Sequence, residues 1–172
     1  MTNVIDVAKK CFQDEAQAIL SLIPNLDDNF TKAIELINAD DTVFAAVSDS
    51  DIITSPLKGI SFVASLCNEN KDLSSYCVAD KIVGKAAAML FVLLNIKVLH
   101  AKTLSKAGKK VLEDNGIDFS YDVLTDLIIN RTGDGMCPME NAVKDDISPA
   151  QALEHINETI AFLKSVHNVK QH

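Results

Sequence analysis

The chain of 172 residues contains no tryptophan, only four prolines and a single arginine, Arg131. Arginine is the residue that most often forms hydrogen bonds with guanine edges and binds phosphates. The formal net charge is −8, whereas nucleic acids and anionic membranes are normally bound by a basic face. We therefore expect neither a nucleic acid nor a membrane among the partners of this protein.

Long apolar runs and paired cysteine motifs are also missing. The longest apolar run covers only residues 86–94, whereas a helix that crosses a bilayer needs about 20 residues. The first six residues show no basic stretch before an apolar one, so no secretory signal is expected. The four cysteines, at positions 11, 67, 77 and 137, form no C-x-x-C pair. This spacing favours no zinc knuckle, and it is typical of a protein in the reducing cytoplasm.

What is present is the composition of a packed globular protein, with 48% hydrophobic and 23% charged residues. The length predicts one domain, with room for an appended element. The pattern along the chain divides it into a helical lead-in over residues 1–40 and an α/β domain over residues 41–172. Within the lead-in, Pro24 interrupts an apolar stripe, and Asp27 or Asp28 can cap a second helix. An amphipathic helix pair outside a core needs a surface on which to bury its stripe, so we expect this lead-in to form a homo-oligomer contact.

The hydrophobic period changes after residue 41. Two short β-prone segments flank a turn and predict a hairpin, and helices and strands then alternate. We expect strands at 42–47, 52–54, 73–79, 96–104 and 117–123, and helices at 60–67, 83–94 and 106–115. This alternation predicts a mixed sheet with a parallel section and helices on its faces, in a three-layer α/β/α sandwich.

The end of the chain is expected to be a loop followed by a helix. Residues 127–147 contain glycine and proline, and therefore predict a loop. Pro149 stands at the first position of the last helix, where proline is favoured. The buried stripe of this helix is predicted to consist of Leu153, Ile156, Ile160 and Leu163.

A first candidate ligand site lies where the chain is predicted to leave a strand and enter a helix. The start of a helix offers unpaired amide donors and a partial positive charge, which together can hold an anion. Candidate ligand-binding residues there are Asp80, Lys81, Gly84 and Lys85. In the alternative interpretation, Asp80 caps the helix, Gly84 lets it approach the sheet, and both lysines are solvated. The segment is not a P-loop, because the G-x-x-x-x-G-K-[ST] frame is absent.

A second candidate site is the loop that holds the single arginine. Arg131 can pair with a carboxylate or phosphate, Asn130 can orient a ligand, and Glu140 is a further candidate ligand-binding residue. Cys137 is the only plausible nucleophile, because a neighbouring positive charge would activate its thiol. In the alternative interpretation, Arg131 ties down Asp134 or Glu140, and Cys137 is buried.

The remaining titratable groups add little. His100 and Lys102 are expected to point outward from a strand. The sequence spacing suggests no Ser–His–Asp arrangement and no Rossmann fingerprint. Neither a metal site nor a cofactor is predicted.

Two motifs carry a family resemblance: Val78-Ala79-Asp80-Lys81-Ile82-Val83-Gly84-Lys85-Ala86-Ala87-Ala88, and Ile129-Asn130-Arg131 with Met136-Cys137-Pro138-Met139-Glu140. With them, the chain resembles a family of small bacterial and archaeal proteins catalogued as a domain of unknown function with a cytidine-deaminase-like fold. The resemblance covers about residues 41–143. It implies the same three-layer sandwich, and it implies no established reaction.

The sequence departs from the true deaminases at their zinc site. Those enzymes carry a His or Cys with a Glu on the helix after the hairpin, and a Pro-Cys-x-x-Cys on the next helix. Here these places hold residues 56–59 and 80–84, which offer no histidine and no thiolate pair. We therefore do not expect zinc-dependent deamination.

Two hypotheses follow, and they leave open whether the protein is an enzyme. The first is a cytoplasmic protein that binds an anionic or nucleotide-like small molecule between the two motifs, without a metal. The alternative is a non-catalytic interaction or regulatory module that self-associates through its N-terminal helices.

Overall fold

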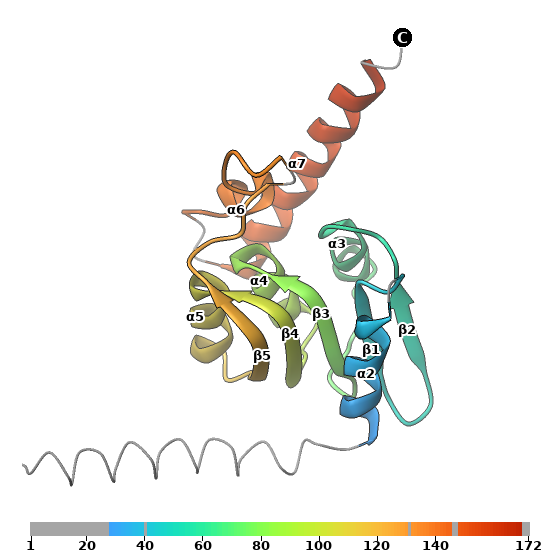
Figure 1. Cartoon of the computed structure of the whole chain (residues 1–172). Coiled ribbons are helices and arrows are strands. Elements are labelled where there is room, and N and C mark those ends of the chain that lie inside the picture. The colour runs from blue at the N-terminus through green and yellow to red at the C-terminus, as the bar shows by residue number, and fades with distance from the viewer. Residues whose placement is uncertain (1–27, 40, 131, 146–147, 170–172) are drawn as a thin grey trace, which may run out of the picture.

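A computed structural model describes residues 28–39, 41–130, 132–145 and 148–169, the side chains of 167–169 excepted. Residues 1–27 of the predicted lead-in and the candidate Arg131 therefore lie outside the described residues. Figure 1 shows the arrangement of the elements. In chain order these are α2 (Asp28–Asn38), β1 (Phe44–Val47), β2 (Ile52–Ser55), α3 (Ser61–Asn68), β3 (Cys77–Val83), α4 (Lys85–Leu93), β4 (Val98–Ser105), α5 (Lys106–Asp114), β5 (Asp118–Thr125), α6 (Pro138–Ala142) and α7 (Pro149–Val169).

The described strands form one mixed sheet in the order β2-β1-β3-β4-β5. β1 is antiparallel to both of its neighbours, β2 and β3. The pairs β3–β4 and β4–β5 are parallel, and α4 and α5 supply the crossovers between them. The hairpin and the parallel section predicted from the sequence are therefore confirmed.

Helices cover both faces of this sheet. The largest apolar cluster joins α3, α4 and α5 to one face, and α7 packs against α3 and α4 on the outside of that layer. On the opposite face, two smaller clusters join α2 to β1, β3 and the start of β4. This arrangement confirms the predicted α/β sandwich.

Helix α2 belongs to this sandwich. Its apolar residues Phe30, Ala33 and Ile37 are buried. Ala33 and Ile37 pack with Ala45 and Ala79 of the sheet, and Phe30 packs with side chains at the starts of β3 and β4. The part of the predicted lead-in that the structure describes thus buries its apolar stripe within the α/β body. The oligomerisation role assigned to residues 1–40 stays a prediction.

Several predicted element boundaries are wrong around β3. The strand predicted at 73–79 is instead β3, Cys77–Val83, and Leu73 is buried in the connection before it. Helix α4 therefore begins at Lys85. The shift arises because Asp80 and Lys81, which propensity excludes from strands, lie in a strand held between two neighbours.

The predicted loop over 127–147 also contains regular structure. The short helix α6 begins at Pro138, and an isolated bridge pairs Ile129 with Met136. Proline at the first turn of a helix needs no amide partner, so the residue that indicated a loop in fact starts a helix. No helix in the described ranges is long and apolar enough to cross a membrane.

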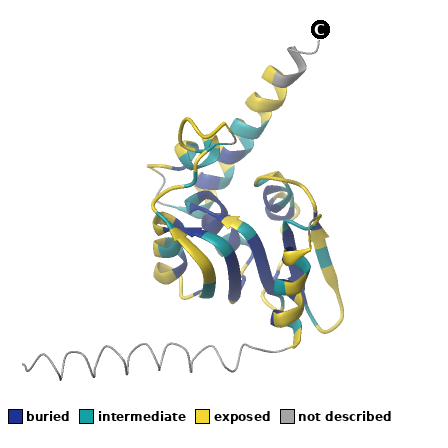
Figure 2. Cartoon of the chain, in the orientation of Figure 1, coloured by how far each residue is buried: buried dark blue, intermediate teal, exposed yellow. Residues whose placement is uncertain are grey.

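Helix α7 is buried over its first half only. Ala152 and Ile156 are inaccessible to solvent, and Leu153 and Ile160 pack against the main core. Every residue from 161 to 166 is exposed, and Figures 1 and 2 show this part of the helix projecting beyond the body. The prediction that Leu163 is buried is wrong, because the neighbouring helices end before they reach it.

Candidate functional site

The start of α4 is the predicted anion site, and it is occupied by a side chain of the protein itself. The amides of Lys85 and Ala86 each donate a hydrogen bond of 2.9 Å to the Glu140 carboxylate, one to each oxygen. Gly84 precedes them, and a Cβ atom at this position would overlap the carboxylate. Helix α6 thus supplies an acceptor for two amide donors that have no partner within α4. A ligand anion would have to displace Glu140.

The two candidate lysines hold different parts of the chain. The Lys85 ammonium donates to the Lys144 carbonyl at 2.8 Å, just after α6. The Lys81 ammonium donates to the Ala39 carbonyl at 3.2 Å, just after α2. Since α2 and α6 lie on opposite sides of the sheet, these contacts do not bring the two charges together over the start of α4. Lys81 lies on β3, so its predicted place at the helix start is wrong.

Asp80 is a buried carboxyl group on β3, and the prediction that it caps a helix is wrong. It is only 7% exposed, and its register neighbours are Phe44 and Ala101. Burial raises the pKa of Asp80 to about 7, although hydrogen bonds from the amides of Ile82 and Lys81 act in the opposite direction. The group is therefore a proton-binding part of the core, near the surface at which α4 begins.

The loop before α6 is organised by Asn130. Its side-chain oxygen accepts from the amides of Gly133 and Asp134, and its amide nitrogen donates to the Asp134 carboxylate at 2.8 Å. The Thr132 hydroxyl also donates to Asp134, and this bond and that of Asn130 lower the pKa of Asp134. Asn130 thus uses its polar atoms within a turn, and its predicted role in orienting a ligand is untested.

Cys137 is the residue before the first turn of α6. Its amide donates to the Ile128 carbonyl at 2.9 Å, and its side chain is half-buried. The described contacts include no base beside the thiol, and the proposed partner Arg131 lies outside the described residues. Its role as a nucleophile stays a prediction.

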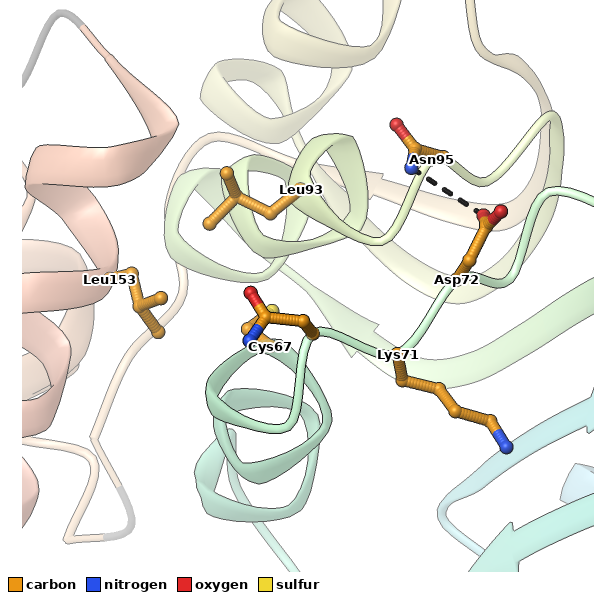
Figure 3. Close-up of a pocket in the computed structure, with 7 residues that line it drawn as sticks. Cys67, Lys71, Asp72, Leu93, Asn95 and Leu153 are labelled. Atoms are coloured by element: carbon orange, nitrogen blue, oxygen red, sulfur yellow. Dashed lines mark hydrogen bonds between the residues drawn. The ribbon is translucent and has the colours of Figure 1, made fainter.

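A pocket that sequence analysis missed lies at the other end of α4 (Figure 3). It has a volume of about 260 Å³ and is lined by Cys67, Asn70, Lys71, Asp72, Leu93, Asn95 and Leu153. Burial raises the pKa of the Cys67 thiol to about 12, so this group is a weak nucleophile. The volume is below the usual ligand range of roughly 300–1,000 Å³. None of the predicted site residues lines it.

The face that carries α2 holds a polar group that sequence spacing could not indicate. His100 Nδ1 lies 2.9 Å from the Ser120 hydroxyl, and Nε2 lies 3.5 Å from the Asp122 carboxylate. The Phe30 ring packs against the imidazole in a T-shaped arrangement, with the ring centres 6.4 Å apart and the ring planes at 82°. Burial lowers the pKa of His100, while the Asp122 charge raises it. The expectation that His100 points into solvent is therefore wrong, because α2 lies over it.

Among the described residues, no three His, Cys, Asp or Glu side chains are grouped so that they could share a metal ion. The resemblance to deaminases stated from the sequence would put their zinc ligands at Pro56–Gly59, in the connection after β2, and at Asp80–Gly84, at the end of β3. The chemistry available there comes from backbone amides, two lysines and one buried carboxyl group.

Comparison with known proteins identifies a family for this chain and a similar solved structure. Residues 32–160, about three quarters of the chain, match the family model described as "Domain of unknown function (DUF1893)". A crystal structure of a DUF1893 family protein from Thermotoga maritima is similar, with 29% sequence identity and a TM-score of 0.69. The likeness covers 79% of this chain and 91% of that protein. Comparison with proteins of curated function finds no match.

Proposed function

This chain belongs to the DUF1893 family of unknown function, and we propose that it is a non-catalytic interaction module that self-associates. One observation carries the proposal, namely the apolar side chains left exposed at the free end of α7, residues 161–166. Phe162 is 64% exposed, and Leu163 and Val166 are 40% and 38% exposed. Contiguous exposed apolar side chains on a globular protein typically mark an interaction surface.

The start of α4 also supports an interaction role, because its polar groups are already bonded within the chain. Its amides hold Glu140, and Lys85 holds a carbonyl of the adjoining segment. Polar groups that satisfy one another within the chain stabilise the fold and leave fewer donors for a ligand. The geometry therefore favours an interaction role over a binding role for a small anion.

The proposal places self-association in the cytoplasm, where the scattered cysteines stay reduced. In this proposal α2 does not form the contact, because its apolar residues Phe30, Ala33 and Ile37 are buried against the sheet. A chain that lacks residues 2–27 should then keep the oligomeric state of the full chain. If this deletion yields a monomer, the contact belongs to the N-terminal segment.

The oligomeric state of the full chain tests the proposal itself. We expect light scattering coupled to gel filtration, and sedimentation velocity, to show a dimer or larger species whose population rises with protein concentration. A monomer at every concentration would overturn self-association.

A second candidate function, binding of an anionic or nucleotide-like small molecule, has one observation in its favour. The amides of Lys85 and Ala86 bind a carboxylate, so their geometry suits an anion. In this function, Glu140 holds the place of the ligand's anionic group and leaves when the ligand binds. Asn130 and Arg131, in the loop before α6, would then contact the rest of the ligand.

Replacement of the internal carboxylate tests this second function. Glu140→Ala exposes both amides, so inorganic phosphate and nucleoside monophosphates should raise the thermal unfolding temperature of this variant more than that of the wild type. Glu113→Ala, on the exposed face of α5, is the matched control. If these anions stabilise neither the wild type nor Glu140→Ala, the second function is wrong.

A further inference from the structure

We infer that α2 is a detachable cover on the sheet, and that protonation of His100 beneath it favours the opening of this cover. The inference goes beyond the proposed function, because it concerns a movement within a single chain. Three features of the molecule support it: the separate apolar clusters under α2, the polar contacts at the two ends of the helix, and the titratable group that the helix covers.

The apolar contacts of α2 are separate from the main core. Most buried side chains belong to the cluster on the opposite face of the sheet, where α3, α4, α5 and α7 pack. Helix α2 instead closes two small clusters, one around Ala33 and Ile37 and one around Phe30 (Figure 1). The sheet side chains beneath it include Ala45 and Ala79, which offer little apolar surface. Opening of α2 therefore leaves the main core intact and costs less free energy than global unfolding.

The two ends of α2 are held by polar contacts at the surface. Near the start of the helix, the Asn29 amide donates to the Asp49 carboxylate at 2.6 Å. At its end, the Lys102 ammonium donates to the Asn38 side-chain oxygen at 2.8 Å. Both contacts are exposed, so water can replace each of them at little net cost. The apolar contacts beneath the helix are therefore what mainly keep α2 in place.

The Phe30 ring, at the start of α2, packs against the imidazole of His100. This imidazole is only 7% exposed. Its neutral form is well accommodated, because Nδ1 lies 2.9 Å from the Ser120 hydroxyl, which donates to it when the proton is on Nε2. The distance of 3.5 Å from Nε2 to the Asp122 carboxylate exceeds the 2.7–2.9 Å of a close charged hydrogen bond. The closed helix thus favours the neutral imidazole.

The charges around His100 do not compensate for its burial. Asp122 on β5 attracts a positive imidazole, whereas Lys102 on the same strand repels it. The register neighbour on β3, Ala79, carries no charge. The other ionisable side chains of the elements packed against His100 are Lys81 on β3, Asp118 on β5, and the exposed Asp28, Lys32 and Glu35 on α2. Burial is the largest influence, and it lowers the pKa of His100 below its ordinary value of 6.5.

The direction of the pH response follows from this burial. When α2 opens, water reaches the imidazole, and the pKa of His100 returns toward 6.5. The open state therefore binds a proton more readily than the closed state. As the pH falls through 6.5 toward the lower pKa of the closed state, the equilibrium shifts toward opening, and at higher pH the helix closes.

Two native thiols report opening of α2 separately from global unfolding. Cys77 is 8% exposed and shares a cluster with Phe30, whereas Cys67 is 7% exposed and belongs to the main core. The experiment measures the modification of each thiol of the full chain by 4,4′-dithiodipyridine, relative to its rate in the urea-unfolded chain at the same pH. On this scale Cys77 should react faster than Cys67. The ratio of the two relative rates should rise at least about twofold between about pH 8 and about pH 5.

Equal relative rates of the two thiols at every pH would overturn the inference, because Cys77 would then be reached only when the whole chain unfolds. A faster reaction of Cys77 that does not change with pH would also overturn it, because opening would then be independent of His100.

Substitution of the histidine tests its part in the opening. In His100→Gln, which has no titrating ring, the ratio should lose its dependence on pH. His155→Gln, at an exposed histidine on α7, is the matched control and should keep it. Asp122→Asn removes the charge that favours the imidazolium, so the dependence on pH should become larger than in the Asp118→Asn control. If His100→Gln retains the full dependence on pH, the inference is wrong.

A nuclear magnetic resonance titration of the full chain measures the same group directly. The ring protons of His100 should report a pKa below 6.5, and Phe30→Ala, which removes part of its cover, should move this pKa toward 6.5. A wild-type pKa at or above 6.5 would overturn the inference. None of these outcomes depends on self-association, so a chain that is monomeric at every concentration would contradict only the proposed function.

Discussion

The start of α4 and the free end of α7 are both helix ends at the surface. The first is closed, because another side chain of the same chain covers it, and the second is open, because its apolar side chains are exposed to solvent. At α4, Glu140 accepts from two amides and covers Gly84. At α7, Phe162, Leu163 and Val166 stay exposed to solvent. In the sequence, the first resembles a ligand site and the second resembles a core stripe.

The difference shows that a helix end and an apolar stripe need partners of different size. A single side chain can bind the unpaired amides of a helix end, whereas an apolar stripe is buried only by a larger surface. Helix amides need partners within hydrogen-bond reach, so a nearby segment of the same chain readily supplies one. An apolar stripe is buried only where a whole element lies beside it. The body of this protein ends at about Ile160, and the stripe of α7 therefore continues beyond it.

The largest effect on the free energy of unfolding is expected at Asp80, on β3 near the closed start of α4. Burial raises its pKa from 3.8 to about 7, so the folded state favours the neutral carboxyl. The corresponding stability is full below pH 3.8 and is lost as the pH rises through about 7. Asp80→Asn should therefore be more stable than the wild type above this pKa, by at most about 4 kcal/mol.

Urea unfolding of both chains at several pH values measures this difference. The advantage of Asp80→Asn should shrink steadily as the pH falls toward 3.8, the ordinary pKa of the group. Asp41→Asn, which makes the same change at an exposed carboxyl group, is the control. An advantage of Asp80→Asn that is independent of pH would contradict a buried, neutral Asp80.

A smaller effect is expected from filling the space above Gly84. In Gly84→Ala, the new methyl group displaces the flexible Glu140 side chain and removes its bonds to the two amides. We expect a loss of about 2 kcal/mol in the free energy of unfolding. In a Glu140→Ala background the same substitution should cost much less, because those bonds are already absent. An equal loss of stability in both backgrounds would mean that the effect of Gly84→Ala does not act through Glu140.

Removal of the charge alone should have a weaker effect still. Glu140→Gln keeps an oxygen acceptor for one amide, but it loses the attraction between a carboxylate and the positive end of α4. The expected loss is about 0.5–1 kcal/mol, and it should diminish at high salt. Thermal unfolding at low and high ionic strength measures it. A salt-independent loss would point to packing as its cause.

The smallest effect on folding is expected at the open end. Phe162→Ala removes a side chain that is 64% exposed and packs against no core cluster. The free energy of unfolding of the dilute monomer should change by no more than about 0.5 kcal/mol, while self-association weakens. A clear loss of monomer stability would mean that Phe162 packs within its own chain, and the comparison between the two helix ends would fail.

Much of the architecture could be predicted from sequence. The hairpin of β1 and β2, the alternation that produces the parallel strands, and the start of α7 at Pro149 all follow from local pattern. The boundaries of β3 could not, because Asp80 and Lys81 have poor strand propensity and are held there by strands on both sides.

The candidate site was predictable only in its residue types. The sequence singles out Gly84, Lys85 and Glu140, which the structure brings together, but it assigns them to a ligand rather than to one another. It also separates His100, Ser120 and Asp122, which meet because β4 and β5 pair in one register. No local pattern specifies the register between strands that a helix separates in the chain.

By itself, the sequence determined the fold class, the parallel strands and the amphipathic character of α7, because hydrophobic period and helix-start signals act over a few neighbouring residues. Only the tertiary structure decided that Glu140 binds the amides at the start of α4. It alone also decided that the apolar stripe of α7 extends beyond the core that buries its first half. Both outcomes depend on which segments meet in space, and chain order does not contain that information.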